Sequence, residues 1–254
     1  MIALAGVTKD YGGVHAVKDL SLELPDQTVL GLIGPNGAGK TTVLNLMTGL
    51  ATPTSGTIAL DERRIDHLKP HAIAALGIAR TYQTSRLFPQ MSALENVVVG
   101  MHLHADDSLL GQLTGWPPTL ARAQRLRTQA RELLGELGLS ERADALARNL
   151  APGEQRRVEI ARAIAMQPRA LLLDEPAAGL NPVETDRLRA EILKLARERN
   201  ISVLLIEHDM SFVMAACERI AVLNFGEKIA EGTPDQVRAD PRVIEAYLGV
   251  EGVA

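Results

Sequence analysis

The chain has 254 residues, of which 46% are hydrophobic and only 3% aromatic, so we expect one large domain or two small domains around an aliphatic core. The formal net charge of −4 argues against nucleic acid as the main partner, because binding to a phosphate backbone needs clustered Lys and Arg. The single cysteine, Cys217, excludes a disulfide within the chain, and we interpret it as a buried thiol in a helix rather than a nucleophile.

The sequence shows no signal for export, membrane insertion or structural zinc. Lys9 and Asp10 interrupt the N-terminus before any apolar region develops, so we expect no signal peptide. The longest uncharged stretch, residues 41–60, is rich in Thr, Ser, Gly and Pro and lacks the apolar length of a membrane span. No cluster of Cys and His predicts a zinc site. We therefore expect a cytoplasmic chain, for which any membrane role needs separate membrane subunits.

The N-terminal part of the chain is predicted to be rich in β-strands. Residues 2–7, 14–24 and 57–60 form short, partly alternating apolar runs with turn residues between them. Residues 29–33 are continuously apolar, which is typical of a buried strand, and residues 40–50 are predicted to follow as a helix.

The loop between that strand and that helix carries the most informative motif of the chain. It fits G-x-x-x-x-G-K-[ST], the phosphate-binding loop of nucleoside triphosphatases, and the strand–loop–helix context disfavours a chance glycine turn. Glycines let backbone N–H groups close around phosphate oxygens, and the helix N-terminus adds partial positive charge. Lys40 is predicted to reach the β- and γ-phosphates and the Thr41 hydroxyl to bind Mg²⁺. The residues predicted to bind the nucleotide here are Gly34, Pro35, Asn36, Gly37, Ala38, Gly39, Lys40, Thr41 and Thr42.

A helical block is predicted from about residue 87 to residue 165, where it interrupts an α/β domain. Residues 120–137 and 158–165 both place apolar side chains at helical spacing. Residues 108–119 contain two glycines, Trp116 and two prolines, and we predict a loop there.

Two strand–helix units are predicted next, with strands at residues 171–173 and 203–206 and helices at residues 183–199 and 210–218. The first of these helices has a recognisable start. Asn181, Pro182 and Glu184 suit the N-cap, first-turn and N3 positions.

Polar side chains follow these strands directly. Asp174 and Glu175 would lie at the carboxyl edge of the sheet, beside the phosphate loop. We predict that Asp174 acts on Mg²⁺ directly or through water, and that Glu175 polarises the attacking water as a general base. His208 is predicted to sense the γ-phosphate, and Gln83 to contact Mg²⁺ and the water while coupling the two parts of the chain. The alternatives are a solvated acidic pair, a structural histidine and an unremarkable linker glutamine.

The order of these motifs resembles that of an ABC transporter ATPase over nearly the whole chain. The phosphate loop, Gln83, residues 150–157 (LAPGEQRR), the acidic pair and His208 follow one another as in that family. The resemblance implies an α/β fold with a P-loop ATPase core, an antiparallel β subdomain and an inserted α-helical subdomain. It places the core at residues 1–86 and 166–254 of a single domain, and the helical signature subdomain at residues 87–165.

The resemblance also implies ATP and Mg²⁺ as cofactors and further nucleotide contacts. Tyr11 and Val17 would flank the adenine, although Tyr11 could also be an ordinary strand residue. Ala151, Gly153 and Glu154 belong to the signature that would close on a partner's ATP. The family signature usually begins Leu-Ser-Gly-Gly-Gln, whereas Ala151 has no hydroxyl and Pro152 has no N–H.

Finer details resemble one branch, the ATP-binding subunits of branched-chain amino acid importers. The stretches that carry this likeness are residues 80–83, 94–97, 176–182 and 243–249 and the extended loop around Trp116.

The resemblance thus implies a subunit that hydrolyses ATP for a transporter of branched-chain amino acids or similar small solutes, at the cytoplasmic face of the cell membrane. Its partners would be a second, different ATP-binding subunit, two membrane-spanning permease subunits and, indirectly, a solute-binding protein, with no nucleic acid. Residues 86–91 mix basic and apolar side chains and are predicted to contact a permease helix, unless they pack internally. An exporter of lipid or polysaccharide, a soluble ABC ATPase acting on ribosomes or DNA, and a small-molecule kinase remain as alternatives.

Overall fold

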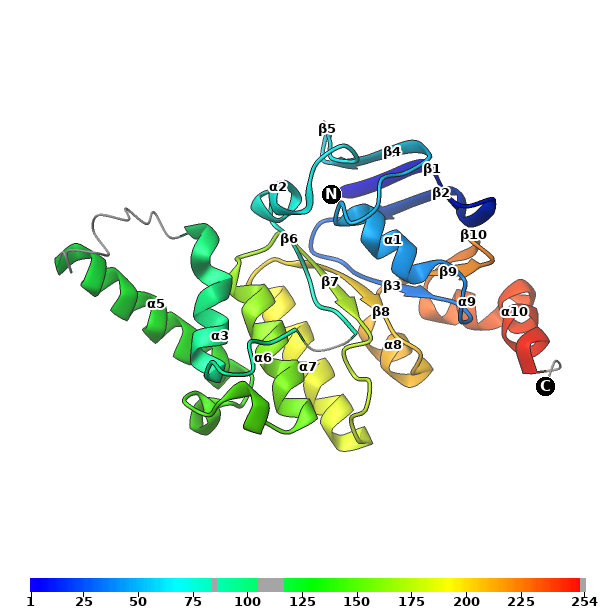
Figure 1. Ribbon diagram of the computed structural model, residues 1–254. Coiled ribbons are helices and arrows are strands. Elements are labelled where there is room, and N and C mark those ends of the chain that lie inside the picture. The colour runs from blue at the N-terminus through cyan, green and yellow to red at the C-terminus, as the bar shows by residue number, and fades with distance from the viewer. Residues whose placement is uncertain (84–85, 105–116, 252–254) are drawn as a thin grey trace. The chain divides into compact units, whose positions relative to one another are not determined.

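The structure is a computed structural model, and it describes residues 1–83, 86–104 and 117–251 (Figure 1). The chain divides into two compact units. Unit 1 comprises residues 1–80, 169–176 and 192–254, and unit 2 comprises residues 81–168 and 177–191. The predicted domain boundaries stay a prediction, and these units differ from them by placing residues 81–86, 166–168 and 177–191 with the helical segments.

Unit 1 contains two sheets. The first is antiparallel, with the strand order β2-β1-β4-β5, and consists of β1 (Ile2–Tyr11), β2 (Val14–Leu24), β4 (Ser55–Leu60) and β5 (Arg63–Arg64). The second has the order β10-β9-β3-β8-β7-β6 and consists of β3 (Val29–Ile33), β6 (Ile78–Arg80), β7 (Ala170–Asp174), β8 (Ser202–Ile206), β9 (Arg219–Asn224) and β10 (Glu227–Gly232).

The second sheet is parallel except for β10, which pairs antiparallel with β9. Every residue of β3, β7 and β8 is buried, which explains why these strands are continuous apolar runs in the sequence. Because β3, β8 and β7 are parallel neighbours, the chain leaves all three at the same edge of the sheet. That edge is where the predicted catalytic residues follow the strands.

The helices of unit 1 include α1 (Lys40–Met47), α2 (Pro70–Ala75), α8 (Met210–Ala216), α9 (Pro234–Ala239) and α10 (Pro241–Glu251). One aliphatic core joins α1 to both sheets, with Val43 and Leu44 of α1 packed among residues of β1, β2, β3 and β4. Burial of that helix face fixes the start of α1 against the end of β3.

Unit 2 is helical. Its elements are α3 (Ala93–Gly100), α5 (Pro117–Glu136), α6 (Pro152–Ala165), the first part of α7 (Pro182–Glu198) and the short turns η1 (Met101–His104), η2 (Ser140–Arg142) and η3 (Ala147–Asn149). Figure 1 shows α3 beside both α5 and α6, in agreement with the contacts between these helices. A Cβ at Gly100 would touch the carbonyl oxygen of Arg162, so this glycine permits the close approach of α3 to α6.

Most of the predicted elements are confirmed, with corrections at their ends. The cap of α7 is confirmed, because Asn181 Oδ1 accepts from the Glu184 N–H at 3.0 Å and Glu184 Oε2 accepts from the Asn181 N–H at 3.1 Å. The predicted loop at residues 108–119 is wrong at its end, since α5 already begins at Pro117, and residues 105–116 lie outside the described residues. The helices predicted to reach residues 50 and 218 end at Met47 and Ala216.

Candidate active site

The phosphate loop connects β3 to α1, and its backbone runs against two other strands. Gly34 has a φ of 149° and Gly39 a φ of 102°, in the region that favours glycine. A Cβ at Gly34 would touch the carbonyl oxygen of Leu223 on β9, and one at Gly39 would touch that of Ala16 on β2. The first and last glycines of the motif are therefore required by the packing of the loop itself. The loop leads into the N-terminus of α1, where unpaired N–H groups favour an anion.

Lys40 is the first residue of α1, and its side chain folds back over the loop. Its Nζ donates to the carbonyl oxygens of Gly34 at 2.7 Å and Pro35 at 2.9 Å. Burial lowers the pKa of Lys40 from its usual value, while Glu175 and Asp174 act in the opposite direction. The Lys40 ammonium is thus close enough to the Asp174 and Glu175 carboxylates to be stabilised by their charge. When a nucleotide binds, the ammonium can donate to phosphate oxygens in place of the two loop carbonyls.

Glu175 and His208 meet at the edge of the sheet. Glu175 Oε1 lies 2.8 Å from His208 Nε2, the Glu175 side chain is 18% exposed, and that of His208 is 45% exposed. Glu175 has a φ of 50°, which is uncommon outside glycine, and its N–H donates to the Ile206 carbonyl oxygen at 2.9 Å. Such a backbone costs on the order of 1–3 kcal/mol and is found at functional sites. A carboxylate held in this way can orient a water and accept its proton.

The structure brings five of the predicted residues together in unit 1: Lys40, Thr41, Asp174, Glu175 and His208. Among the described residues, no group of three or more His, Cys, Asp or Glu forms a metal cage. Mg²⁺ usually binds through one or two carboxylates together with substrate phosphates and waters. The Thr41 hydroxyl and the Asp174 carboxylate supply oxygen donors of that kind, so this donor set fits a magnesium ion that arrives with a nucleotide.

Tyr11 and Val17 differ in their availability for adenine. Tyr11 ends β1 with 49% of its surface exposed, and Lys9 Nζ lies 4.9 Å from the centroid of its ring. Val17 has no exposed surface. Tyr11 therefore offers a free aromatic face, whereas Val17 lies in the core behind the phosphate loop, where direct contact with a base needs local rearrangement.

Gln83 and the signature belong to unit 2, and one arginine links them. Arg156 on α6 donates to the carbonyl oxygens of Tyr82 at 2.7 Å and Gln83 at 3.0 Å, and to Glu159 at 3.0 Å. The Glu159 carboxylate also accepts from the N–H of Arg86 at 2.7 Å. The start of α6 therefore fixes the backbone that carries Gln83.

The signature forms the start of α6. Ala151 is the N-cap, with φ −62° and ψ 155°, and Pro152 occupies the first turn, where a missing N–H costs no helical hydrogen bond. Glu154 Oε2 accepts from the Ala151 N–H at 2.9 Å, and Glu154 Oε1 accepts from Arg142 at 2.9 Å. A Cβ at Gly153 would lie 3.0 Å from the Leu180 side chain. The departures from the family signature are thus compatible with a well-formed helix start.

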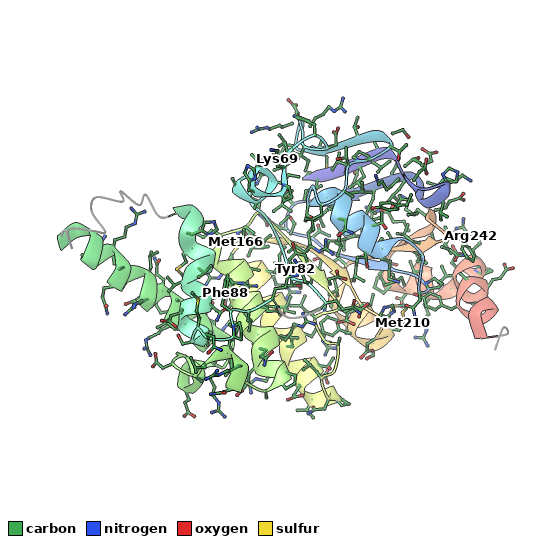
Figure 2. The ribbon with its side chains drawn as sticks, in the orientation of Figure 1. Lys69, Tyr82, Phe88, Met166, Met210 and Arg242 are labelled. Atoms are coloured by element: carbon green, nitrogen blue, oxygen red, sulfur yellow. The ribbon has the colours of Figure 1, made fainter. Side chains whose placement is uncertain are left out.

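Residues 86–91 expose the mixture of side chains that the sequence predicts for a contact surface. Phe88 is 47% exposed and Met91 38% exposed. The Arg86 guanidinium lies 4.1 Å from the centroid of the Tyr82 ring, and Arg162 donates to the Arg86 carbonyl oxygen at 2.8 Å. Figure 2 labels Tyr82 and Phe88, which both belong to this part of unit 2.

Sequence reasoning missed one residue of the site. Arg80, the last residue of β6, donates to Asp174 Oδ2 at 2.9 Å and to Asn45 Oδ1 at 2.7 Å. Its partners are far away in the sequence, so no local signal pointed to this residue.

Comparison with known proteins defines the class. A family model described as ABC transporter matches residues 17–178, and another described as branched-chain amino acid ATP-binding cassette transporter matches residues 227–253. The chain is 47% identical to the high-affinity branched-chain amino acid transport ATP-binding protein BraF of Pseudomonas aeruginosa and 45% identical to the corresponding protein LivG of Escherichia coli K12, over 98% of this chain and 98% of each relative. A solved structure of an ATP-binding cassette of an ABC transporter, in its ADP conformation, is 30% identical, with a TM-score of 0.84, and the match covers 98% of both chains.

The chain therefore belongs to the ABC transporter family. It is an ATP-binding subunit of that family, whose members hydrolyse ATP to power transport. The predicted family, the predicted fold class and the predicted ATPase activity are confirmed. Among the described residues, no helix is long and apolar enough to cross a membrane.

Proposed function

We propose that this chain drives the uptake of branched-chain amino acids by hydrolysing ATP at the edge of its parallel sheet. The observation that best supports ATP hydrolysis is the 2.8 Å contact between Glu175 and His208, on the same sheet edge as Lys40. The substrate class rests on the family match at residues 227–253 and on the branched-chain amino acid relatives.

Each residue of the site has a role in this proposal. The phosphate loop and Lys40 bind the phosphates, and Thr41 and Asp174 hold the metal ion that accompanies ATP. When bound, Mg²⁺ neutralises charge that develops on the phosphates. Glu175 accepts the proton of the attacking water, and His208 keeps that carboxylate oriented. Gln83 contributes from unit 2, and Tyr11 stacks on adenine with Val17 behind it.

The proposed assembly contains further subunits. Two permease subunits span the membrane, a second ATP-binding subunit closes on this one, and a solute-binding protein delivers the amino acid. Phe88 and Met91 support a permease contact, because their side chains are exposed and the Arg162 guanidinium lies 5.9 Å from the centroid of the Phe88 ring. This arrangement would hold the chain at the cytoplasmic face of the membrane.

The second ATP-binding subunit is proposed to be a different chain. Ala151 cannot donate a hydroxyl hydrogen bond to a partner's γ-phosphate, and a hydrogen bond to a charged group is worth roughly 1.5–3 kcal/mol. The site built on Lys40, capped by the partner's signature, would then be the better hydrolytic site. An active transporter purified with two copies of this chain alone would contradict this asymmetry.

The substrate is tested by uptake into vesicles that contain the transporter assembled with its solute-binding protein. ATP-dependent accumulation of radiolabelled leucine, suppressed by excess isoleucine and valine but not by lysine, is the expected result. The same vesicles with Lys40→Ala serve as the control and should take up nothing. Uptake of an unrelated solute, or ATP-driven release of a lipid or polysaccharide, would overturn the proposed substrate class.

A further inference from the structure

Arg80 connects the two elements that carry the proposed metal ligands. Its guanidinium donates through Nη2 to Asp174 Oδ2 at 2.9 Å, at the end of β7. Through Nη1 it donates to Asn45 Oδ1 at 2.7 Å, on α1. Arg80 itself ends β6, where it stands opposite Leu172 of β7 in the parallel pair. One side chain thus touches a residue on each side of the site.

The position of Asn45 matters because of its spacing from Thr41. The two residues are four apart on α1, so they lie on the same face of the helix, one turn from each other. A group that fixes Asn45 relative to Asp174 therefore also fixes the first turn of α1, which carries Thr41, relative to that carboxylate.

The Arg80–Asp174 pair is buried, unlike most ion pairs of unit 1. The two side chains are 5% and 6% exposed, whereas the arginine of the comparable Arg64–Asp66 pair is 60% exposed. A buried pair is screened little by solvent, and the planar guanidinium forks between two acceptors in a way that lysine cannot reproduce. The geometry of Asp174 thus depends on a rigid contact and not only on a nearby positive charge.

We propose that Arg80 is a positioning residue for the metal ion that accompanies ATP. It orients the Asp174 carboxylate and locks it to α1, so that Asp174 and Thr41 are held at a fixed separation. This inference rests on the proposed role of Asp174 and Thr41 in metal binding. Arg80 also directly precedes the segment that carries Gln83, so the same contact anchors the first of the two points where the chain leaves unit 1.

The test measures metal affinity and not turnover. Mn²⁺ is titrated into the full-length chain loaded with a non-hydrolysable ATP analogue, and its electron paramagnetic resonance signal reports free and bound metal. Loss of a group that orients a metal ligand typically weakens metal binding by about 10–100-fold, which is the result expected for Arg80→Gln. Arg80→Lys keeps the charge but loses the fork, so it should recover only part of the affinity. Binding of the analogue without metal should be unchanged in both variants.

Three further variants separate the role of Arg80 from a general loss of structure and from the metal role of Asp174. Arg64→Gln, which breaks an ion pair of the same unit whose arginine is 60% exposed, should leave Mn²⁺ binding unchanged. Asn45→Ala removes only the link to α1, so it should weaken Mn²⁺ binding less than Arg80→Gln does. Arg80→Gln breaks a buried ion pair, which is strongly destabilising, so this variant could fail to fold. In that case Asn45→Ala tests the role of Arg80 instead. Asp174→Asn tests the metal role itself.

Two results would overturn the inference. One is Mn²⁺ binding within about twofold of the parent chain in Arg80→Gln or, where that variant does not fold, in Asn45→Ala. The other is a parallel loss of metal-free nucleotide binding, which would make the contact merely structural. If Asp174→Asn weakens Mn²⁺ binding and Arg80→Gln does not, only the inference about Arg80 fails, and the metal role of Asp174 stands. If neither change has an effect, the proposed metal role of Asp174 fails as well.

Discussion

Of the two residues predicted to contact adenine, Tyr11 and Val17, Tyr11 has the more exposed side chain. Its ring is about half exposed and lies under the Lys9 ammonium. If the ring stacks on adenine, Tyr11→Ala should weaken ATP binding by roughly 1–3 kcal/mol, on the scale of base–aromatic stacking. Tyr11→Phe and Tyr11→Trp should bind normally in the same titration, since both keep an aromatic face.

Lys9→Ala is the matched control for Tyr11, because it removes the neighbouring charge and leaves the ring in place. It should change ATP affinity much less than Tyr11→Ala. Equal affinities for Tyr11→Ala and the parent chain would assign Tyr11 to the strand alone.

Cys217 follows α8 and is buried, as predicted, although it lies just beyond the helix rather than in it. Burial, with a smaller contribution from Glu218, raises the pKa of Cys217 from 9.0 to about 12. The folded state thus favours the neutral thiol. The contribution of Cys217 to the free energy of unfolding is therefore fully present below pH 9.0 and is lost as the pH rises toward about 12.

The corresponding prediction concerns reactivity. At pH 8 the folded chain should react very slowly with a thiol reagent, because the reagent attacks the thiolate and the side chain is enclosed. The same chain in urea should react at the rate of a free cysteine. Fast, complete labelling of the native protein would show that Cys217 is accessible.

At the residue level, local motifs predicted the ends of β3, β7 and β8 well. Asp174, Glu175 and His208 come at or just after the ends of apolar runs, and Lys40 closes the glycine-rich loop after another, so their placement depends only on recognising the strand and the loop motif. The role of Arg80 depends on which strands are neighbours, since its partners are 35 and 94 positions away in the sequence. No local pattern contains that information.

Among the elements, α6 offers a direct test of local stability. Its N-cap, Ala151, has the geometry of a cap but no acceptor, while Glu154 already accepts from its N–H. Ala151→Ser would complete the capping box and should stabilise the chain by about 0.5–2 kcal/mol. Urea unfolding with an unchanged slope would report this gain as a shift of the midpoint.

Ala151→Gly is the control for α6, because glycine is tolerated at N-caps but brings no side-chain acceptor. Its unfolding midpoint should lie below that of Ala151→Ser. A serine variant no more stable than the glycine variant would mean that the start of α6 is not capped as the structure shows.

Several of the elements that sequence reasoning missed are short or lack a periodic apolar pattern, although β9 and α10 were also missed. β6 has three residues, β5 has two, and β10 (EKIAEG), at the end of the sheet, shows no regular alternation of apolar and polar residues. α2 and α9 have six residues each, too few for helical spacing to become visible. Strand order was equally hidden, since the pairing of β3 with β8 and β9 joins residues far apart in the sequence.

For the molecule as a whole, the predicted site residues are divided between the two compact units. Lys40, Asp174, Glu175 and His208 belong to unit 1, whereas Gln83 and the signature belong to unit 2. Arg156 ties Gln83 to the helix that the signature begins, so a shift of that helix would be transmitted to Gln83 through rigid contacts.

The most direct test of this account measures ATP hydrolysis and leucine uptake together in the assembled transporter with Glu175→Gln. Loss of a general base should lower both rates by about 10²–10⁴-fold. ATP binding should stay unchanged, because Lys40 and the phosphate loop are untouched. Glu218→Gln, an exposed carboxylate in the same unit, is the control and should preserve both activities. Near-normal hydrolysis or uptake in Glu175→Gln would contradict the account.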